Sequence, residues 1–116
     1  MRDFKNLIVW KKSHENALFI YGLTKVFPTE EQSGLSSQLR RASVSIPTNI
    51  AEGCGKFTQK DIANIQQISL GSSHEIEYLK LLSFELKYIG ETNFKNLHEA
   101  INEVNAMLIA LIKKVR

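Results

Sequence analysis

The chain has 116 residues, enough for one domain, and its 43 % hydrophobic and 23 % charged residues match globular proteins, which excludes extensive disorder. Its single cysteine, Cys54, excludes an internal disulfide and a zinc site built from several cysteines, and no apolar run approaches the ~20 residues of a membrane-spanning helix. The net charge of +3 permits an anionic partner but does not demand one.

The first predicted helix spans residues 8–26. It follows a basic segment whose apolar run, residues 7–10, is too short for a signal-peptide core, and with the single cysteine this favours a reduced, cytoplasmic setting. Phe27-Pro28 ends the helix, because the residue before a proline avoids helical backbone angles. We expect its buried side to consist of five residues, with His14 between them: Trp10, Ala17, Leu18, Tyr21 and Val26.

The second predicted helix spans residues 33–54. Its apolar residues keep helical spacing on both sides of Pro47: they are Leu35, Leu39, Ala42, Ile46 and Ile50. A proline inside a helix frees the carbonyl four residues earlier, here that of Ser43, and kinks the helix axis. The unbroken spacing favours one kinked helix, with two separate helices as the alternative, and Gly53 and Gly55 end it.

The third predicted helix spans residues 59–89. Its boundary signals are Thr58 as N-cap with Asp61 three residues later, Phe57 and Ile62 as a hydrophobic staple, and Gly90 as a stop. The residues in its middle, 69–75, are small or polar. This predicts a close approach to a neighbouring backbone, where a buried polar layer can also form.

The fourth predicted helix begins at Thr92 or Asn93 and carries an apolar stripe of seven residues: Phe94, Leu97, Ile101, Val104, Leu108, Leu111 and Val115. Further apolar residues flank this stripe: Ala100, Met107, Ala110 and Ile112. That is more apolar width than one bundle core needs, so we expect a second face to be buried between subunits. Short connections between long helices favour antiparallel neighbours. Residues 1–116 are therefore predicted to form one all-α domain, an up-down-up-down antiparallel four-helix bundle.

Nothing in the sequence predicts catalytic, cofactor or metal chemistry, so we expect no enzyme. The three histidines, His14, His74 and His98, include no pair three or four residues apart, which removes the helical metal-binding pair. Cys54 has no histidine near it and is interpreted as a small buried hydrophobe or an incidental thiol. The run Gly53-Cys54-Gly55-Lys56 is superficially similar to a phosphate-binding loop, but it lacks the preceding strand and the Gly-Lys-Ser/Thr ending.

Two glutamates, Glu52 and Glu75, are expected to face each other across the second and third helices. A pair of glutamates in a bundle core is typical of a di-metal carboxylate site, but that site also needs two Glu-x-x-His motifs. The residues three positions before the histidines are instead Lys11, Gly71 and Lys95, so the metal interpretation fails. The better hypothesis is a buried polar network of Arg41, Asn49, Glu52, Ser72 and Glu75, because buried charges persist only when they are paired.

Residues 38–53 read QLRRASVSIPTNIAEG, and this segment resembles the signature of the 23S rRNA intervening-sequence protein family, also called the bacterial four-helix bundle protein family. Further matches lie along almost the whole chain: Phe4, Leu7, Val9, Trp10, Phe27, Pro28, Gly34, Leu35, Gly71, Ser72 and Glu75. The chain departs from the usual pattern at Ser33, where an aromatic residue is common, and at Ser73, where a larger apolar residue is frequent.

The resemblance implies a left-handed four-helix bundle that assembles as a ring-like homopentamer. Members of the family are encoded inside inserts within bacterial large-subunit rRNA genes and also as free-standing genes, and some carry a ribosomal-protein label that reflects this location. A related branch is similar to accessory proteins of diversity-generating retroelements, which bind nucleic acid and a reverse transcriptase.

Three classes of function remain: an oligomeric protein that binds structured RNA or DNA, a protein-interaction scaffold without a nucleic-acid role, and, least favoured, an enzyme. The candidate nucleic-acid-binding residues are Arg2, Lys5, Lys11, Lys12, Arg40 and Arg41. Their clustering on one surface favours the first class, and an exposed apolar groove without basic residues favours the second. The basic residues at the other end of the sequence, Lys113, Lys114 and Arg116, are interpreted as complements of a helix dipole.

Overall fold

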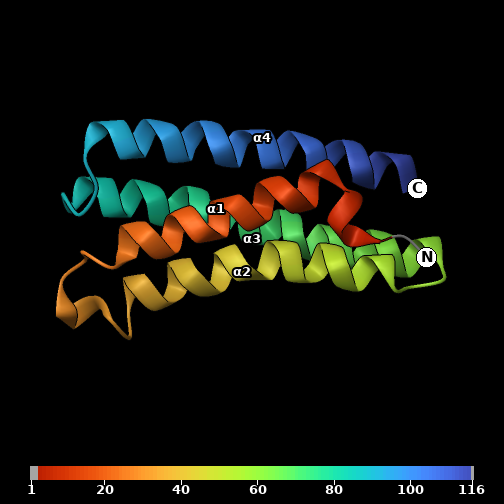
Figure 1. The fold of residues 1–116 in the computed structure, drawn as a ribbon, viewed down its shortest axis with the longest axis horizontal. Helices are drawn as coiled ribbons and strands as arrows, with labels where there is room; N and C mark the ends of the chain where they lie inside the picture. Colours follow the sequence, from red (N-terminus) through yellow and green to blue (C-terminus); the bar gives the residue numbers. More distant parts are fainter. Residues whose placement is uncertain (1–2, 116) are drawn as a thin grey trace.

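Four helices run alternately up and down in the computed structural model, which describes residues 3–115 (Figure 1). They are α1 (Ile8–Thr24), α2 (Leu35–Cys54), α3 (Gln59–Glu85) and α4 (Glu91–Val115), with short 3-10 turns η1 (Phe4–Asn6) and η2 (Thr29–Glu31) before α1 and α2. The predicted all-α four-helix bundle is confirmed. The helices share one core, and the described part of the molecule extends over 43 × 24 × 20 Å.

The core side of α4 is the stripe that the sequence predicts. Leu97, Ile101, Val104 and Leu108 are each at most 1 % exposed. Ile112, expected on a flanking face, is buried in the core instead, while Ala110 is exposed. The described part of α4 is therefore less apolar on its outer side than predicted.

The buried side of α1 differs from the prediction. Leu18 and Val26 are 61 % and 80 % exposed, and Tyr21 is 41 % exposed. The residues that α1 buries are Val9, Ser13, Asn16, Ala17, Ile20 and Thr24. Two of the polar ones are tolerated because their hydroxyls donate back to their own helix, Ser13 to the Trp10 carbonyl at 3.0 Å and Thr24 to the Ile20 carbonyl at 2.9 Å. The prediction failed because apolar spacing alone does not say which side of a helix faces inward.

Small polar side chains join α2 to α3. The Ser69 hydroxyl donates to the Ile46 carbonyl at 3.2 Å, and Ser69 is fully buried. Ser43 and Ser73 are also fully buried, and Ser73 donates to Asn105 on α4. The predicted close approach with a polar layer is therefore confirmed. Pro47 lies inside a single continuous α2, as expected, whereas the kink and the left-handed arrangement stay predictions.

The ends of α3 are held by two different devices. At its start the Thr58 hydroxyl oxygen accepts from the Asp61 amide at 3.1 Å, as predicted, but Phe57 is 86 % exposed, so the predicted staple with Ile62 is wrong. At its end Lys87 adopts a positive φ of 66°, and the Tyr88 amide donates to the Ser83 carbonyl at 2.9 Å. This is the Schellman arrangement, and it stops α3 before the Gly90 that the sequence suggested.

Candidate functional site

The predicted nucleic-acid-binding residues near the amino terminus have different environments. Lys5 and Lys11 are exposed, whereas the Lys12 amine is 3.1 Å from the Glu103 carboxylate on α4, which offsets its charge. Arg2 lies outside the described residues. Only Lys5 and Lys11 therefore remain as unneutralised candidates in this part of the surface.

The two arginines of α2 lie far from those lysines. Arg40 is half-buried: its Nε donates to the Thr24 hydroxyl at 2.8 Å, and its guanidinium lies 4.8 Å from the centre of the Tyr21 ring. Arg41 is exposed. Because Thr24 is thirteen residues beyond Lys11 on α1, roughly 20 Å at 1.5 Å per residue, the five candidates that the structure describes do not form one patch. Arg40 instead ties α1 to α2.

The fold gathers a different set of cations at one end of the bundle. The start of α1, the α2–α3 connection and the end of α4 meet there (Figure 1). We call this the basic end: within segments 3–7, 53–61 and 111–114 it has five exposed lysines against two aspartates, Asp3 and Asp61. The lysines are Lys5, Lys56, Lys60, Lys113 and Lys114. Only Lys5 was a sequence candidate, because the other four come from two distant parts of the chain.

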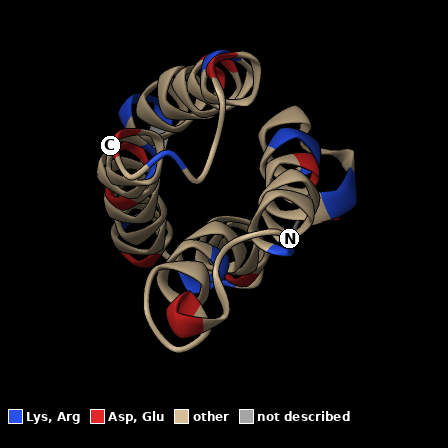
Figure 2. Ribbon diagram, turned by 90° about the vertical axis from the view of Figure 1, so that its left-hand side faces the viewer, with Lys and Arg blue, Asp and Glu red and all other residues tan. Residues whose placement is uncertain are grey.

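The opposite end of the bundle has the reverse balance of charge. Segments 22–34 and 84–92 contain four glutamates, Glu30, Glu31, Glu85 and Glu91, against two lysines, Lys25 and Lys87. Figure 2 views the molecule from this end. Charge is therefore distributed unevenly along the long axis of the bundle, with excess lysines at one end and excess glutamates at the other. The net charge of +3 does not show this asymmetry.

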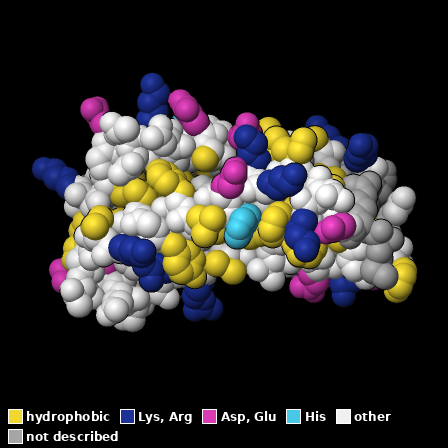
Figure 3. All heavy atoms as spheres, viewed as in Figure 1, with side chains coloured by type: hydrophobic (Ala, Val, Ile, Leu, Met, Phe, Trp, Pro, Cys, Tyr) yellow, Lys and Arg dark blue, Asp and Glu magenta, His cyan; other side chains and the backbone are white. Residues whose placement is uncertain are grey.

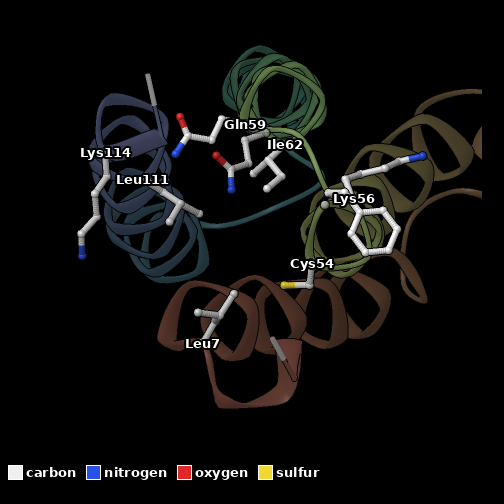
Figure 4. A pocket seen from close by; sticks show the side chains of 10 residues that line it. Leu7, Cys54, Lys56, Gln59, Ile62, Leu111 and Lys114 are labelled. Atoms are coloured by element: carbon white, nitrogen blue, oxygen red, sulfur yellow. The ribbon is translucent and has the colours of Figure 1, made fainter. Parts of the chain in front are cut away.

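A cavity of about 400 Å³ opens at the basic end (Figure 4). Its walls come from Leu7, which follows η1, and from the end of α2, the start of α3 and the end of α4. The lining residues are Leu7, Gly53, Cys54, Lys56, Phe57, Gln59, Ile62, Gln66, Leu111 and Lys114. Gln66 is only 6 % exposed, and its Oε1 has no hydrogen-bond partner among the described residues. The cavity thus combines apolar walls, a buried acceptor and two lysines.

The outer side of α1 and α2 forms an apolar groove of about 530 Å³. Figure 3 shows hydrophobic side chains along this side of the molecule. The groove is lined by Phe4, Trp10, His14, Ala17, Leu18, Tyr21, Val44, Pro47, Thr48 and Ala51, and none of these is a lysine or arginine. Trp10 is braced by two rings, with Phe4 edge-on at 4.9 Å and His14 stacked at 5.0 Å between ring centres. This is the surface that the α1 prediction had assigned to the core.

The predicted polar network is found only in part. The Asn49 amide donates to the Ser45 carbonyl at 2.7 Å and to the Ser45 hydroxyl at 3.0 Å, and the Ser72 hydroxyl donates to the Ser45 hydroxyl at 2.9 Å. Glu52, Glu75 and Arg41 are exposed, so the prediction that these three charged side chains are buried is wrong. Serine and asparagine side chains satisfy one another's hydrogen bonds, and their burial avoids the desolvation cost of two buried carboxylates.

One ionisable cluster lies between α3 and α4. Lys80 is 4 % exposed; its Nζ is 2.6 Å from His98 Nδ1 and 4.9 Å from the centre of the Phe94 ring. Burial lowers the pKa of Lys80, and the nearby Glu77 carboxylate opposes this shift. Within residues 3–115 no three histidine, cysteine, aspartate or glutamate side chains come together as a metal site would require. The same residues include no helix long and apolar enough to cross a membrane.

Comparison with known proteins assigns the chain to a family. The model of the 23S rRNA-intervening sequence protein matches residues 5–110. No curated protein gives a significant match. A crystal structure of a protein of unknown function from the S23 ribosomal protein family of Bacteroides thetaiotaomicron VPI-5482 superposes with a TM-score of 0.84, at 28 % identity over 91 % of this chain and 96 % of that chain. The chain belongs to the 23S rRNA-intervening sequence protein family.

Proposed function

We propose that this protein is a non-catalytic, oligomeric nucleic-acid-binding protein whose contact surface is the basic end. The observation that carries the proposal is the gathering of Lys56, Lys60, Lys113 and Lys114 with Lys5 at one end of a bundle whose other end is acidic. Phosphate groups are the anionic partners that such a surface attracts, and each contact releases counterions from the nucleic acid.

Self-assembly is supported by exposed apolar side chains on two different parts of the bundle. One part is the groove along α1 and α2, where Leu18 and Tyr21 are exposed. The other is α3, where Ile68, Tyr78 and Leu81 are 54 %, 61 % and 43 % exposed. Contact between two different surfaces is heterologous, and such contacts close into rings when the rotation allows. In a ring formed by side-to-side contacts, every copy presents its basic end on the same rim.

Several basic ends on one rim raise the apparent affinity of the ring for a nucleic acid, although each copy makes the same contacts as a monomer. A monomer with a few phosphate contacts binds weakly, whereas several copies that engage one nucleic acid act at high effective concentration. The contacts are made to phosphates, so binding is expected to fall steeply as salt rises and to depend little on sequence.

Two experiments test this proposal. Light scattering at low micromolar concentration should give a mass several times that of the 13.2 kDa chain, and a monomeric mass would contradict the ring. Titration of structured RNA and duplex at two salt concentrations should show salt-sensitive binding that Lys56→Glu/Lys60→Glu removes. Absence of binding at low salt would overturn the nucleic-acid role.

A second function, a protein-interaction scaffold, is favoured by the groove itself, because its lining is apolar and contains no lysine or arginine. If the chain is monomeric and binds no nucleic acid, that groove becomes the surface to which a partner helix would dock. The light-scattering and titration results together therefore separate the two functions.

A further inference from the structure

The residue Phe57 is out of place on the surface of this protein. It is 86 % exposed, the highest value among the large hydrophobic residues whose exposure the structure describes, and it lies in the connection between α2 and α3. Lys56 precedes it and Lys60 follows it within one turn, and both are exposed. Proteins that bind single-stranded nucleic acids combine aromatic rings with nearby lysines in this way. The bases stack on the ring, and the phosphates contact the cations.

The cavity beside Phe57 has the volume and the lining of a site for a small, mostly apolar group. Its volume of about 400 Å³ lies within the range of roughly 300–1,000 Å³ typical of small-molecule sites. Figure 4 shows Leu7, Ile62 and Leu111 extending into it from three different segments. No aspartate or glutamate lines the cavity, so nothing in the lining repels a ligand that carries phosphate.

The buried wall supplies one unsatisfied hydrogen-bond acceptor. Gln66 lines the cavity, is 94 % buried, and leaves its Oε1 without a donor among the described residues. An acceptor that is desolvated without a partner is costly, so the site lacks a donor that a ligand would bring. The exocyclic amino groups of adenine and cytosine are donors of this kind.

The lysines stand where the rest of a nucleotide chain would leave the cavity. Lys56 and Lys114 line its mouth, and Figure 4 shows both of their side chains pointing away from its centre, on opposite sides. A base held inside would direct its sugar and the two flanking phosphates outward, towards these amines. The lysines at the mouth and the volume of the cavity are therefore both compatible with a nucleotide that is part of a strand.

We propose that the basic end holds one unstacked base of single-stranded RNA or DNA. The base stacks on Phe57, its amino group donates to Gln66 Oε1 once this side chain turns towards the cavity, and Lys56 and Lys114 contact the flanking phosphates. This inference rests on the proposed function, because it names the part of a nucleic acid that the basic end recognises. It adds a preference for single strands, in which bases are free to leave the stack.

The experiment compares labelled single-stranded decamers with the matching duplex at low salt, using the parent chain, Phe57→Leu and Phe57→Trp. Loss of one stacked base weakens binding by about 5- to 150-fold, so Phe57→Leu should show this loss for the single strand and none for the duplex, while Phe57→Trp retains parental affinity. Because Phe57 is exposed, Phe57→Leu should melt like the parent.

A decamer in which every nucleotide is abasic gives a reading that needs no protein variant, because no shift of the strand along the site can then supply a base. This decamer should bind the parent more weakly than the intact strand by at least a similar factor. If it binds as the intact one does, or if Phe57→Leu binds as the parent does, the base-binding site is refuted while salt-dependent binding still supports the basic end. If Phe57→Leu changes the mass in light scattering, Phe57 belongs to a contact between copies and the inference is wrong. If the parent binds no strand at low salt, both proposals fall.

Discussion

Tyr88 and Glu31 are 57 residues apart in sequence, yet the Tyr88 hydroxyl donates to Glu31 Oε2 at 3.0 Å. The other carboxylate oxygen, Oε1, accepts from the Leu35 amide at 3.1 Å at the start of α2. One side chain thus joins the α1–α2 connection, the first turn of α2 and the α3–α4 connection. Gly34 makes room for it, because a Cβ there would lie 2.8 Å from Glu31 Oε1.

The Tyr88–Glu31 bond should make stability sensitive to alkaline pH. The hydrogen bond to Glu31 raises the pKa of Tyr88, with burial as a smaller cause, so the folded state holds this proton more tightly than the unfolded state does. The contribution is fully present below the ordinary tyrosine pKa of about 10 and is lost as pH rises through the folded value. Melting curves from pH 8 to 11 should fall more steeply for the parent than for Tyr88→Phe, and equal slopes would contradict this.

Lys87→Gly should stabilise the protein. Lys87 holds a positive φ of 66°, which costs an L-residue roughly 1–2 kcal/mol, and glycine relieves this while losing about 0.4–1 kcal/mol through its more flexible unfolded chain. A net gain of roughly 0.5–1 kcal/mol in the free energy of unfolding is expected by urea titration. Lys87→Ala is the control, since it removes the same side chain but keeps the unfavourable backbone angle, and a similar gain from alanine would refute the explanation.

Two neighbouring small residues of α3 should respond in opposite directions to enlargement. Ser69 is fully buried against the Ile46 carbonyl, so Ser69→Leu should destabilise the fold by about 1–3 kcal/mol through overpacking. Gly71 is exposed, and a Cβ there would meet nothing within 4 Å, so Gly71→Ala should gain about 0.5–1 kcal/mol from better helix propensity. Urea titrations that give both changes the same sign would mean that the α2–α3 contact is described wrongly.

The exposed glutamates should contribute little to stability. Glu52→Ala and Glu75→Ala are expected to change the free energy of unfolding by no more than about 0.5 kcal/mol, as is usual for exposed side chains. Asn49→Ala should cost about 1 kcal/mol, because it removes both hydrogen bonds to Ser45. A loss near 3 kcal/mol for either glutamate would restore the buried charged network that the sequence suggested.

The sequence predicts the helices well because their signals are local. The stripe of Leu97, Ile101 and Val104 and the Thr58 cap each depend on residues within a few turns, and both are found in the structure. The inward side of α1 could not be predicted, because large apolar residues such as Leu18 lie outside, whereas Ser13 and Thr24 lie inside and donate hydrogen bonds to their own helix. That choice is made by the packing of α1 against α2 and α4, which periodicity does not contain.

The candidate site was harder to predict for a similar reason. The paired arginines, Arg40 and Arg41, are conspicuous in the sequence. Arg40, however, donates a hydrogen bond to Thr24 and lies over the Tyr21 ring. The lysines of the basic end are ordinary in sequence and become a surface only when the ends of three segments meet. The exposure of Phe57 likewise follows from the direction of the α2–α3 connection, not from its neighbours in sequence.

The central claim, that the basic end binds nucleic acid, is tested most directly by reversing two charges at either end of the bundle. Fluorescence anisotropy of one labelled structured RNA, at about 50 and 200 mM salt, compares the parent with Lys56→Glu/Lys60→Glu and with Lys25→Glu/Lys87→Glu. Both variants change the net charge equally, and all four lysines are exposed. The account predicts that the parent and the second variant bind in a salt-dependent manner and that the first variant does not. Equal weakening by both variants, or no binding by the parent at the lower salt concentration, would contradict it.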